Sequence, residues 1–378
     1  MSRTKPVAVA RPKVTVLGAG SWGTTFAKIL GDGGNDVTVW ARRPELALEI
    51  REAKRNSDYL PGINLPASVT ATSSLAQALA GAEMVFVSIP SQSLRENLAG
   101  IKPLLPENAI VVSLMKGVEK KTGLRMSEVL EAGLGISRDR IAVASGPNLA
   151  LEIAREQPTA AVVASTSLET AERVATLVSN GYFRTFVNTD VIGTEFGGVL
   201  KNLIAVAIGI VDGVGYGENT KASIITRGLV EMTDFAVAYG AEAETLSGLA
   251  GLGDLIATSG SSLSRNNTAG RLLGQGLSFA DVVKSMNQTA EGLASVGPVL
   301  ELAAARGVDM PIVKQVSQVL AGTLNPKDIA PHLTTDSTEP QGERTSDGSK
   351  TRGGVALWGS VKRALDQLRH GGRSTGGN

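Results

Sequence analysis

The glycine-rich stretch GAGSWG at residues 18–23 is the feature that most restricts how this chain can fold. It follows a β-branched run at residues 14–17 and opens a segment with helical spacing, so it joins a strand to a helix. In that setting Gly18 permits the tight turn, Gly20 lets the backbone approach a pyrophosphate, and Gly23 lets the helix pack closely on the strand. Free N–H groups at the helix start favour an anion. The stretch predicts dinucleotide binding; the alternative is a tight turn without a ligand.

Short apolar, β-branched runs alternate with segments of helical spacing through the first half of the chain. Near-continuous apolar strands separated by helices are typical of a parallel sheet covered on both faces. We therefore predict an α/β, Rossmann-like, doubly wound domain over residues 13–190. Its expected strands are residues 13–17, 36–41, 84–89, 109–114, 141–144 and 159–164, and its expected helices include residues 22–30 and 91–105.

From about residue 191 the pattern becomes helical, which predicts an all-helical C-terminal domain over residues 191–324. The expected helices are residues 195–211, 220–238, 293–306 and 311–321. Residues 1–12 are predicted to be a flexible extension, and residues 325–378, rich in Pro, Thr, Ser and Gly, a disordered tail. Within the tail, residues 355–368 have weak amphipathic spacing, which leaves a docking helix open as an alternative.

Charge and composition exclude several classes of function. The 37 basic and 36 acidic residues give a net charge of +1, so no overall attraction to nucleic acid or to an anionic membrane is expected. The absence of cysteine excludes disulfides and Cys-ligated metal sites, and no metal is expected. Apolar runs such as residues 203–211 fall short of the roughly 20 residues of a membrane span. We expect a cytoplasmic protein without a membrane span.

The end of the second expected strand bears on the choice of cofactor. An acidic residue there normally binds the ribose 2′-hydroxyl of NAD. This chain has Arg42 and Arg43 instead, and their guanidinium groups suit a 2′-phosphate. We therefore expect NADP(H) to bind alongside NAD(H); the alternative is two solvated arginines after a strand.

Lys201 interrupts an otherwise apolar helical run. The only histidines, His332 and His370, lie in the tail, and no tyrosine is followed by a lysine four residues on, so other common proton donors are missing. Desolvation lowers the pKa of a lysine and makes its ammonium a better donor near neutral pH. Lys201 is therefore the predicted acid, with Asn202 as a hydrogen-bonding partner; the alternative is a structural lysine that reaches a helix edge.

Two later segments supply polar groups to such a site. Asp254 follows the small, apolar stretch GLAGLG and is suited to position the lysine or bind a substrate hydroxyl, or else to cap a helix. Ser264, Arg265 and Asn266 precede a helical run and suit a small phosphate, although a polar turn would have the same composition.

Several blocks in a fixed order carry a resemblance to a known family. They are GAGSWG, VSIPS, LMKGVE, ASGPNLALEIA, GTEFGGVLKNLIAVAIG, GLAGLGDL, SRNNTAG and AEG. Over roughly residues 13–322 the chain resembles the bacterial NAD(P)-dependent glycerol-3-phosphate dehydrogenases. That resemblance implies reduction of dihydroxyacetone phosphate to sn-glycerol 3-phosphate, a phospholipid precursor, with NAD(H) or NADP(H), in a homodimer.

The resemblance also implies roles for individual residues. The implied catalytic residues are Lys201, Asp254 and Asn202. The cofactor would contact Gly18, Gly20, Ser21, Trp22, Gly23, Arg42, Arg43, Lys116, Ala150, Arg265, Thr289 and Glu291. The substrate would contact Lys116, Gly146, Asn148, Lys201, Asp254, Ser264, Arg265 and Asn266.

The chain departs from the family pattern at two positions. Asn148 replaces a Ser or Thr of many relatives, and Asn267 replaces a second arginine. The implied mechanism is direct hydride transfer from NAD(P)H to C2 of the substrate, with Lys201 as the proton donor and Asp254 and Asn202 orienting it. Two alternatives stay open: a related two-domain reductase of another carbonyl or hydroxy acid, and a nucleotide-binding sensor without catalysis.

Overall fold

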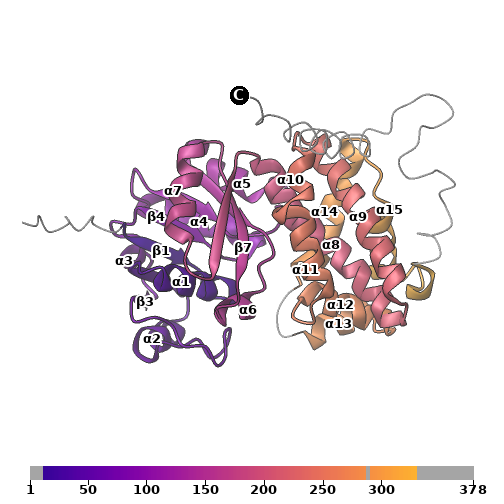
Figure 1. Cartoon of the computed structure of the whole chain (residues 1–378), viewed down its shortest axis with the longest axis horizontal. Coiled ribbons are helices and arrows are strands. Elements are labelled where there is room, and N and C mark those ends of the chain that lie inside the picture. The colour runs from indigo at the N-terminus through magenta and orange to yellow at the C-terminus, as the bar shows by residue number, and fades with distance from the viewer. Residues whose placement is uncertain (1–11, 287–289, 330–378) are drawn as a thin grey trace, which may run out of the picture.

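The computed structural model describes residues 12–286 and 290–329, which form a sheet-containing half and a helical half (Figure 1). The last strand ends at Asn188 and the longest helix begins at Val191, so the change of element type falls at the predicted position near residue 190. Most of the predicted extension and tail, including residues 355–368, lies outside the described residues.

Eight strands form one sheet in the order β3-β2-β1-β4-β5-β6-β7-β8. The six predicted strands are confirmed. Two strands at the sheet edges, β3 and β8, were not expected, because their threonine and arginine side chains interrupt the apolar signal. The strands are β1 Val14–Leu17, β2 Val37–Trp40, β3 Val69–Thr72, β4 Met84–Val87, β5 Ile110–Ser113, β6 Ile141–Ser145, β7 Thr159–Ala164 and β8 Phe183–Asn188.

The sheet is parallel, as expected, except at one pair, since β6 and β7 run antiparallel. Their connection contains only the five-residue helix α6 Ala150–Ala154. A parallel pair needs a crossover that carries the chain back along the sheet, whereas an antiparallel pair does not. The short connection therefore turns the chain back and places α6 at the end of the sheet where β6 finishes.

Helices cover both faces of the sheet, as the doubly wound pattern predicts. One face packs around Phe26, Phe86 and Phe183, and the other around residues such as Leu94 and Leu130. The predicted helix over residues 91–105 is a single α-helix only in its middle part, with a 3₁₀ turn on each side. The main helices are α1 Ser21–Asp32, α2 Pro44–Ala53, α3 Leu75–Leu79, α4 Leu94–Ile101, α5 Met126–Leu134 and α7 Leu168–Val178.

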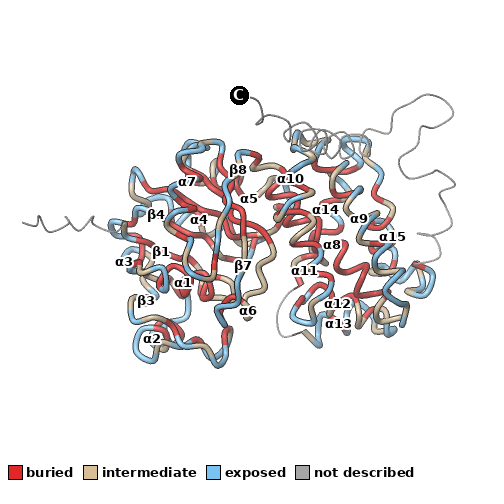
Figure 2. Tube along the Cα trace, in the orientation of Figure 1, coloured by how far each residue is buried: buried red, intermediate tan, exposed pale blue. Residues whose placement is uncertain are grey.

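The helical half is built around α8 Val191–Val214, which is buried along most of its length (Figure 2). The four predicted helices are confirmed with shifts of a few residues at their ends. The surrounding helices are α9 Glu218–Ala238, α10 Ala243–Ser247, α11 Asp254–Gly260, α12 Arg265–Gly274, α13 Phe279–Ser285, α14 Glu291–Ala305 and α15 Pro311–Leu320.

Close packing of α8 on α12 depends on missing side chains. A Cβ atom on Gly209 would lie 2.2 Å from the carbonyl oxygen of Asn267, and one on Gly270 would lie 2.1 Å from that of Val206. Such distances are far below van der Waals contact, so the two helix backbones touch directly. This contact lays α12 along the C-terminal half of α8.

Of the described helices, α8 alone is long and apolar enough to cross a membrane by length and composition. This helix has 24 residues, so the shortness of apolar runs such as residues 203–211 does not by itself exclude a span. In this fold 83% of its most apolar window is buried inside the protein. A helix that is apolar all round and covered by other helices is typical of the core of a large globular domain.

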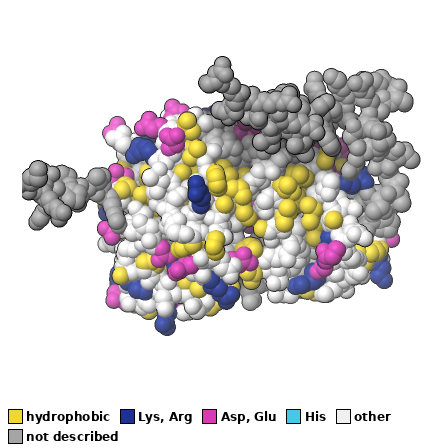
Figure 3. Space-filling view, viewed as in Figure 1, with side chains coloured by type: hydrophobic (Ala, Val, Ile, Leu, Met, Phe, Trp, Pro, Cys, Tyr) yellow, Lys and Arg dark blue, Asp and Glu magenta, His cyan; other side chains and the backbone are white. Residues whose placement is uncertain are grey.

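Basic and acidic side chains are mixed over the face of the molecule shown in Figure 3. The described residues visible on that face thus form no extended patch of one sign, in keeping with the near-zero net charge.

Candidate active site

The turn between β1 and α1 has the geometry that its glycines predict. Gly18 has a φ of +113°, and a Cβ atom there would lie 2.2 Å from the carbonyl oxygen of Ser88. A Cβ atom on Gly23 would lie 2.0 Å from the carbonyl oxygen of Gly18. Neither position can carry a side chain without displacement of the backbone. These two glycines fix the close packing of α1 on β1 and β4.

Gly20 differs from the other two, because a Cβ atom there would meet no heavy atom within 4 Å. It is the N-cap residue of α1 and has no side chain to occupy the free N–H groups of the helix. An open cradle over a free helix start fits a pyrophosphate group, which accepts hydrogen bonds from N–H groups and is favoured by the helix dipole. The residues present therefore fit a dinucleotide cofactor.

The neighbouring residues of the predicted cofactor site lie around this turn. The Ser21 hydroxyl donates to the carbonyl oxygen of Tyr59 at 2.7 Å, and the Trp22 ring packs edge-on against Phe26 at 5.5 Å between centroids. The bond to Tyr59 ties α1 to the segment before β3, whereas the ring contact lies within α1. Both side chains stay partly accessible next to the cradle.

Arg42 and Arg43 follow β2 and are exposed at the same end of the sheet. The Arg43 guanidinium donates to the Asp58 carboxylate at 2.5 Å and lies 5.7 Å from the centroid of the Tyr59 ring. Asp58 would compete with a ribose 2′-phosphate for this guanidinium. This pair could not be predicted from a local pattern, because Asp58 lies 15 residues away in an irregular segment.

The structure brings Lys201 and Asp254 together with Lys116. Lys201 Nζ lies 3.0 Å from Asp254 Oδ1, and Lys116 Nζ lies 2.5 Å from Asp254 Oδ2. Lys116 also donates to the carbonyl oxygen of Gly146 at 3.0 Å. Lys116 follows β5 in the sheet-containing half, whereas Lys201 and Asp254 belong to α8 and α11. One carboxylate thus holds two lysines from the two halves of the molecule.

Burial sets the proton affinity of this group. Desolvation lowers the pKa of Lys201 to about 8; the Asp254 carboxylate opposes this change and the Lys116 charge adds to it. Burial alone would raise the pKa of Asp254, but Lys116 and Lys201 outweigh that effect and hold its pKa below the ordinary value. At neutral pH the group therefore consists of a carboxylate and a lysine that gives up its proton readily.

Thr258 completes the surroundings of Lys201 and was not predicted. Its Oγ1 accepts a hydrogen bond from Lys201 Nζ at 2.6 Å and donates to Asp254 Oδ1 at 3.1 Å. Asp254 and Thr258 lie four residues apart, one turn along α11, and so face the same way. That spacing was the available signal, but it becomes visible only once α11 is known to be a helix.

Asn202 does not have the predicted contact with Lys201. Its amide donates to the carbonyl oxygen of Gly198 at 3.2 Å and its oxygen accepts from Asn266 at 2.8 Å. Adjacent residues of a helix point in different directions, so Asn202 faces α12 while Lys201 faces α11. The prediction that Asn202 pairs with Lys201 is therefore wrong in this structure.

The turn before α12 uses two of its predicted phosphate ligands internally. Ser264 Oγ caps the helix by accepting from the N–H of Asn267 at 3.2 Å. The Asn266 side-chain oxygen accepts from the N–H of Gly292 at 3.0 Å. The groups that suit an anion here are the other N–H groups at the start of α12 and the Arg265 guanidinium, whose charge also acts on Glu291.

Glu291 lies at the start of α14, close enough to interact electrostatically with the charged side chains of the site. Burial raises its pKa, while Arg265, Lys116 and Lys201 act in the opposite direction. Thr289, which was predicted beside it, lies outside the described residues. The AEG block, which contains Glu291, thus lies near Lys116 and Lys201 at the start of α14.

Asn148 and Ala150 lie in the connection after β6. Both polar atoms of the Asn148 side chain are buried without a partner in the protein. The carbonyl oxygen of Ala150 accepts from the Thr25 hydroxyl at 3.3 Å, which places the start of α6 beside α1. A buried amide with two unused ends costs free energy unless a ligand satisfies it.

The two family profiles of the NAD-dependent glycerol-3-phosphate dehydrogenases match this chain, the N-terminal profile over residues 13–171 and the C-terminal profile over residues 190–331. The chain belongs to the NAD-dependent glycerol-3-phosphate dehydrogenase family. The resemblance drawn from its sequence blocks is confirmed.

Individual family members support the same assignment. A glycerol-3-phosphate dehydrogenase [NAD(P)+] from Leifsonia xyli is 75% identical over 365 residues, which cover 95% of this chain and 99% of that protein. One from Thermobifida fusca is 50% identical over 330 residues, 87% of this chain and 98% of that protein. The Leifsonia match covers more than residues 13–322, so the similarity continues beyond the predicted region.

The crystal structure of glycerol-3-phosphate dehydrogenase from Coxiella burnetii has the same fold. It is 34% identical, covers 86% of this chain and 99% of that chain, and superposes with a TM-score of 0.81. The family fold of a sheet followed by a helical region is therefore present here.

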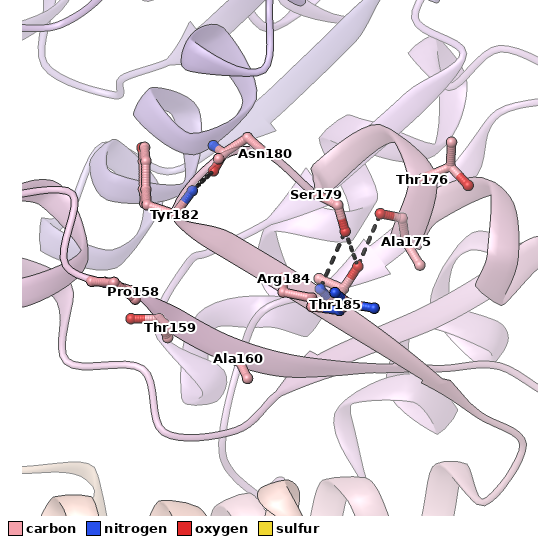
Figure 4. A pocket seen from close by; sticks show the side chains of 11 residues that line it. Pro158, Thr159, Ala160, Ala175, Thr176, Ser179, Asn180, Tyr182, Arg184 and Thr185 are labelled. Carbon is pink, nitrogen blue, oxygen red and sulfur yellow. Dashed lines mark hydrogen bonds between the residues drawn. The ribbon is translucent and has the colours of Figure 1, made fainter.

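Two further observations limit the site. Within residues 12–286 and 290–329, no group of three or more His, Cys, Asp or Glu side chains is arranged to hold a metal ion. A wide surface groove of about 800 Å³ lies away from the lysines, between α7, β7 and β8 (Figure 4). On its wall Ser179 and Thr185 bond to each other, and Thr185 also donates to the carbonyl oxygen of Ala175. Among the described residues, none of those that line the groove has a buried side-chain polar atom without a hydrogen-bond partner.

Proposed function

We propose that Lys201 supplies the proton when this chain, an NAD(P)-dependent glycerol-3-phosphate dehydrogenase, reduces dihydroxyacetone phosphate to sn-glycerol 3-phosphate. One observation carries the proposal: Lys116 and Lys201, from two separate segments, both contact the carboxylate of Asp254, from a third. Such a buried, charged cluster has no structural need of two lysines, but it suits a carbonyl that must gain a proton.

The environment of Lys201 supports the role of acid. Its pKa of about 8 leaves the ammonium charged at neutral pH and able to donate. Asp254 and Thr258 hold Nζ from one side, at 3.0 and 2.6 Å. A carbonyl oxygen that takes the remaining donor direction would receive the proton, while Asp254 keeps the ammonium oriented.

Lys116 and Asn148 are the groups that we assign to the substrate hydroxyl and carbonyl region. Lys116 is fixed by Asp254 and Gly146, and the Asn148 amide is buried with both ends unused. An amide can donate to and accept from a hydroxyl group, as a Ser or Thr would. Asn148 therefore retains the hydrogen-bonding capacity that its departure from the family pattern had put in question.

We assign the substrate phosphate to the start of α12. The first N–H groups of this helix and the Arg265 guanidinium form an anion site, and the hydrogen bond of Asn266 to Asn202 places it next to Lys201 on α8. Phosphate binding at this distance from the reacting carbon would hold the carbonyl in position. Ser264 and Asn266 then act by shaping the turn rather than through their side-chain donors.

The cofactor is assigned to the Gly20 cradle, with Arg42, Arg43 and Ala150 around it and Glu291 at the lysine end. Bound NAD(P)H supplies the hydride for the substrate carbon. The exposed arginines favour a 2′-phosphate, while the Asp58 partner of Arg43 lowers that advantage. We propose that both NADH and NADPH are used.

The test is the oxidation of NADH and of NADPH with dihydroxyacetone phosphate, beside unphosphorylated dihydroxyacetone. Wild type should turn over the phosphorylated ketone with both cofactors and the unphosphorylated one poorly. Arg265→Ala should raise the KM for dihydroxyacetone phosphate by about tenfold to a hundredfold, because a charge-assisted contact is lost. An equal effect on both ketones would overturn the phosphate assignment.

We also propose that the protein is a cytoplasmic homodimer with domains over residues 13–190 and 191–324. The resemblance to the family supports the dimer, and the lack of cysteine suits a reducing compartment. Sedimentation at micromolar concentration tests the dimer, since a species with the 39.1 kDa mass of one chain would contradict it.

A further inference from the structure

Glu195 is a buried carboxylate of the helical half whose hydrogen bonds all go to the sheet-containing half. It lies on α8, six residues before Lys201, and its side chain is 3% exposed. Its oxygens accept from Arg125 Nη1 at 2.6 Å, from the N–H of Ser127 at 2.8 Å and from the Ser127 hydroxyl at 2.6 Å. None of the roles described above uses it.

The bond to the Ser127 N–H makes Glu195 a helix cap supplied from elsewhere in the chain. Arg125 is the N-cap residue of α5, and an arginine side chain has no acceptor for the free N–H groups that follow. Glu195 fills that role across the boundary between the two halves. A carboxylate at a helix start also interacts favourably with the helix dipole.

The segment between Lys116 and Arg125 is a short, internally bonded loop. Val118 and Arg125 pair as an antiparallel bridge, and Glu119 N–H donates to the carbonyl oxygen of Leu124 at 2.9 Å. The carboxylate of Glu119 is held by Arg95 through two bonds, of 2.7 and 2.8 Å. Bonds that close a loop in this way restrict how far one end can move relative to the other.

Both ends of this loop are attached to the helical half. At one end Lys116 contacts Asp254, and at the other Arg125 contacts Glu195. Glu195 and Lys201 share the rigid helix α8, and Asp254 contacts Lys201 directly. The Lys116 loop is therefore held to the helical half at both of its ends. Together these two attachments restrict the distance between Lys116 and Lys201.

The cost of burying this ion pair argues that it has a task besides stability. Removing two charges from water is costly, and buried pairs contribute little net stability compared with apolar residues of similar size. Their better-supported use is to fix one arrangement among several. The guanidinium of Arg125 is further confined by Glu128 at 3.0 Å and by the Phe196 ring, 6.0 Å from its centroid.

We propose that Glu195 is a positioning residue for the reduction: through Arg125 and Ser127 it fixes the Lys116 loop to α8 and so holds Lys116 on Asp254 beside Lys201. This inference rests on the proposed roles of the two lysines. When the attachment is lost, Lys116 withdraws from Asp254. The charge of Lys116 depresses the pKa of Lys201 and competes for its counter-ion, so this withdrawal raises the pKa of Lys201.

The test compares Glu195→Gln with Glu128→Gln. Both changes neutralise a carboxylate that contacts Arg125, but only the first breaks a contact between the halves. In Glu195→Gln we expect kcat for dihydroxyacetone phosphate reduction to fall about tenfold or more, since misplacement by an ångström is costly. The alkaline limb of kcat/KM, which for wild type lies near the Lys201 pKa of about 8, should move to higher pH. Glu128→Gln should leave both unchanged.

Thermal unfolding and hydrogen exchange of residues 117–124 separate this role from a structural one. A lower Tm with an unchanged alkaline limb and unchanged loop exchange in the folded protein would overturn the inference, and so would wild-type behaviour. If Glu195→Gln does not fold, Ser127→Ala, which removes one of the three bonds, should move the limb in the same direction by a smaller amount. If wild type shows no alkaline limb at all, the proposed role of Lys201 fails instead.

Discussion

The cofactor turn and the lysine cluster are both predicted by short motifs, yet they are built in opposite ways. The turn is continuous in sequence and works through the backbone: three glycines within six residues leave N–H groups open at the start of α1. The cluster is assembled from α8, α11 and the loop after β5, and works through the charges of buried side chains. The cofactor turn depends on space that no side chain fills, whereas the lysine cluster depends on contacts between side chains.

This difference predicts how each region responds to substitution. A change in the turn acts through volume, so its effect depends on where the added atoms go. A change in the cluster acts through charge and hydrogen bonding, so it leaves the fold and the cofactor cradle in place while it removes the chemistry. The substitutions below separate the two cases.

The largest effect is expected for Lys201→Ala. Loss of the general acid should lower kcat for dihydroxyacetone phosphate reduction by about 10²- to 10⁴-fold. It should also remove the decline of activity above pH 8 that follows deprotonation of Lys201 in wild type. The Kd of NADPH, measured by fluorescence titration, should change little. A kcat near that of wild type would refute the role of Lys201 as the proton donor.

A smaller effect, of another kind, is expected for Gly20→Val. The added side chain meets no protein atom within 4 Å at its Cβ, so Tm should stay within about 3 °C of wild type. It fills the cradle, so the KM of NADH and of NADPH should rise about tenfold or more. Gly18→Ala is the matched comparison: its φ of +113° and the contact with Ser88 should lower Tm clearly. Equal Tm losses in both variants would remove the distinction between them.

The smallest effect is expected for Asp58→Asn. This change releases the Arg43 guanidinium from its carboxylate, which is half exposed and contributes little to stability. The KM for NADPH should fall by about two- to fivefold while the KM for NADH stays constant. An equal change for both cofactors would show that Arg43 does not face the 2′-phosphate.

The sequence predicts most of the fold because its signals are local. The six central strands and the helical half follow from apolar runs and helical spacing, and the GAGSWG turn carries its own geometry. The edge strands β3 and β8 were missed because strands at an edge do not need a continuous apolar pattern. The antiparallel β6–β7 pair was missed because chain direction depends on the length and path of a connection.

The site is predicted less completely, because its contacts join residues that lie far apart. Lys201 and Asp254 were identified as partners, but Asn202 faces α12 instead. Thr258 lies four residues after Asp254, and that spacing has meaning only on a helix. The bonds of Glu195 to Arg125 and Ser127 span about 70 residues and leave no mark in either local pattern.

The charges gathered around Asp254 also bear on how quickly the substrate arrives. Lys116, Lys201 and Arg265 supply three positive charges against the two carboxylates of Asp254 and Glu291. A chain whose net charge is only +1 thus presents a local positive potential where a phosphate ester must enter. Such a potential raises the encounter rate with anions, and ions in solution screen it over about 8 Å at physiological strength. The capture of substrate should therefore depend on ionic strength even though the protein as a whole is nearly neutral.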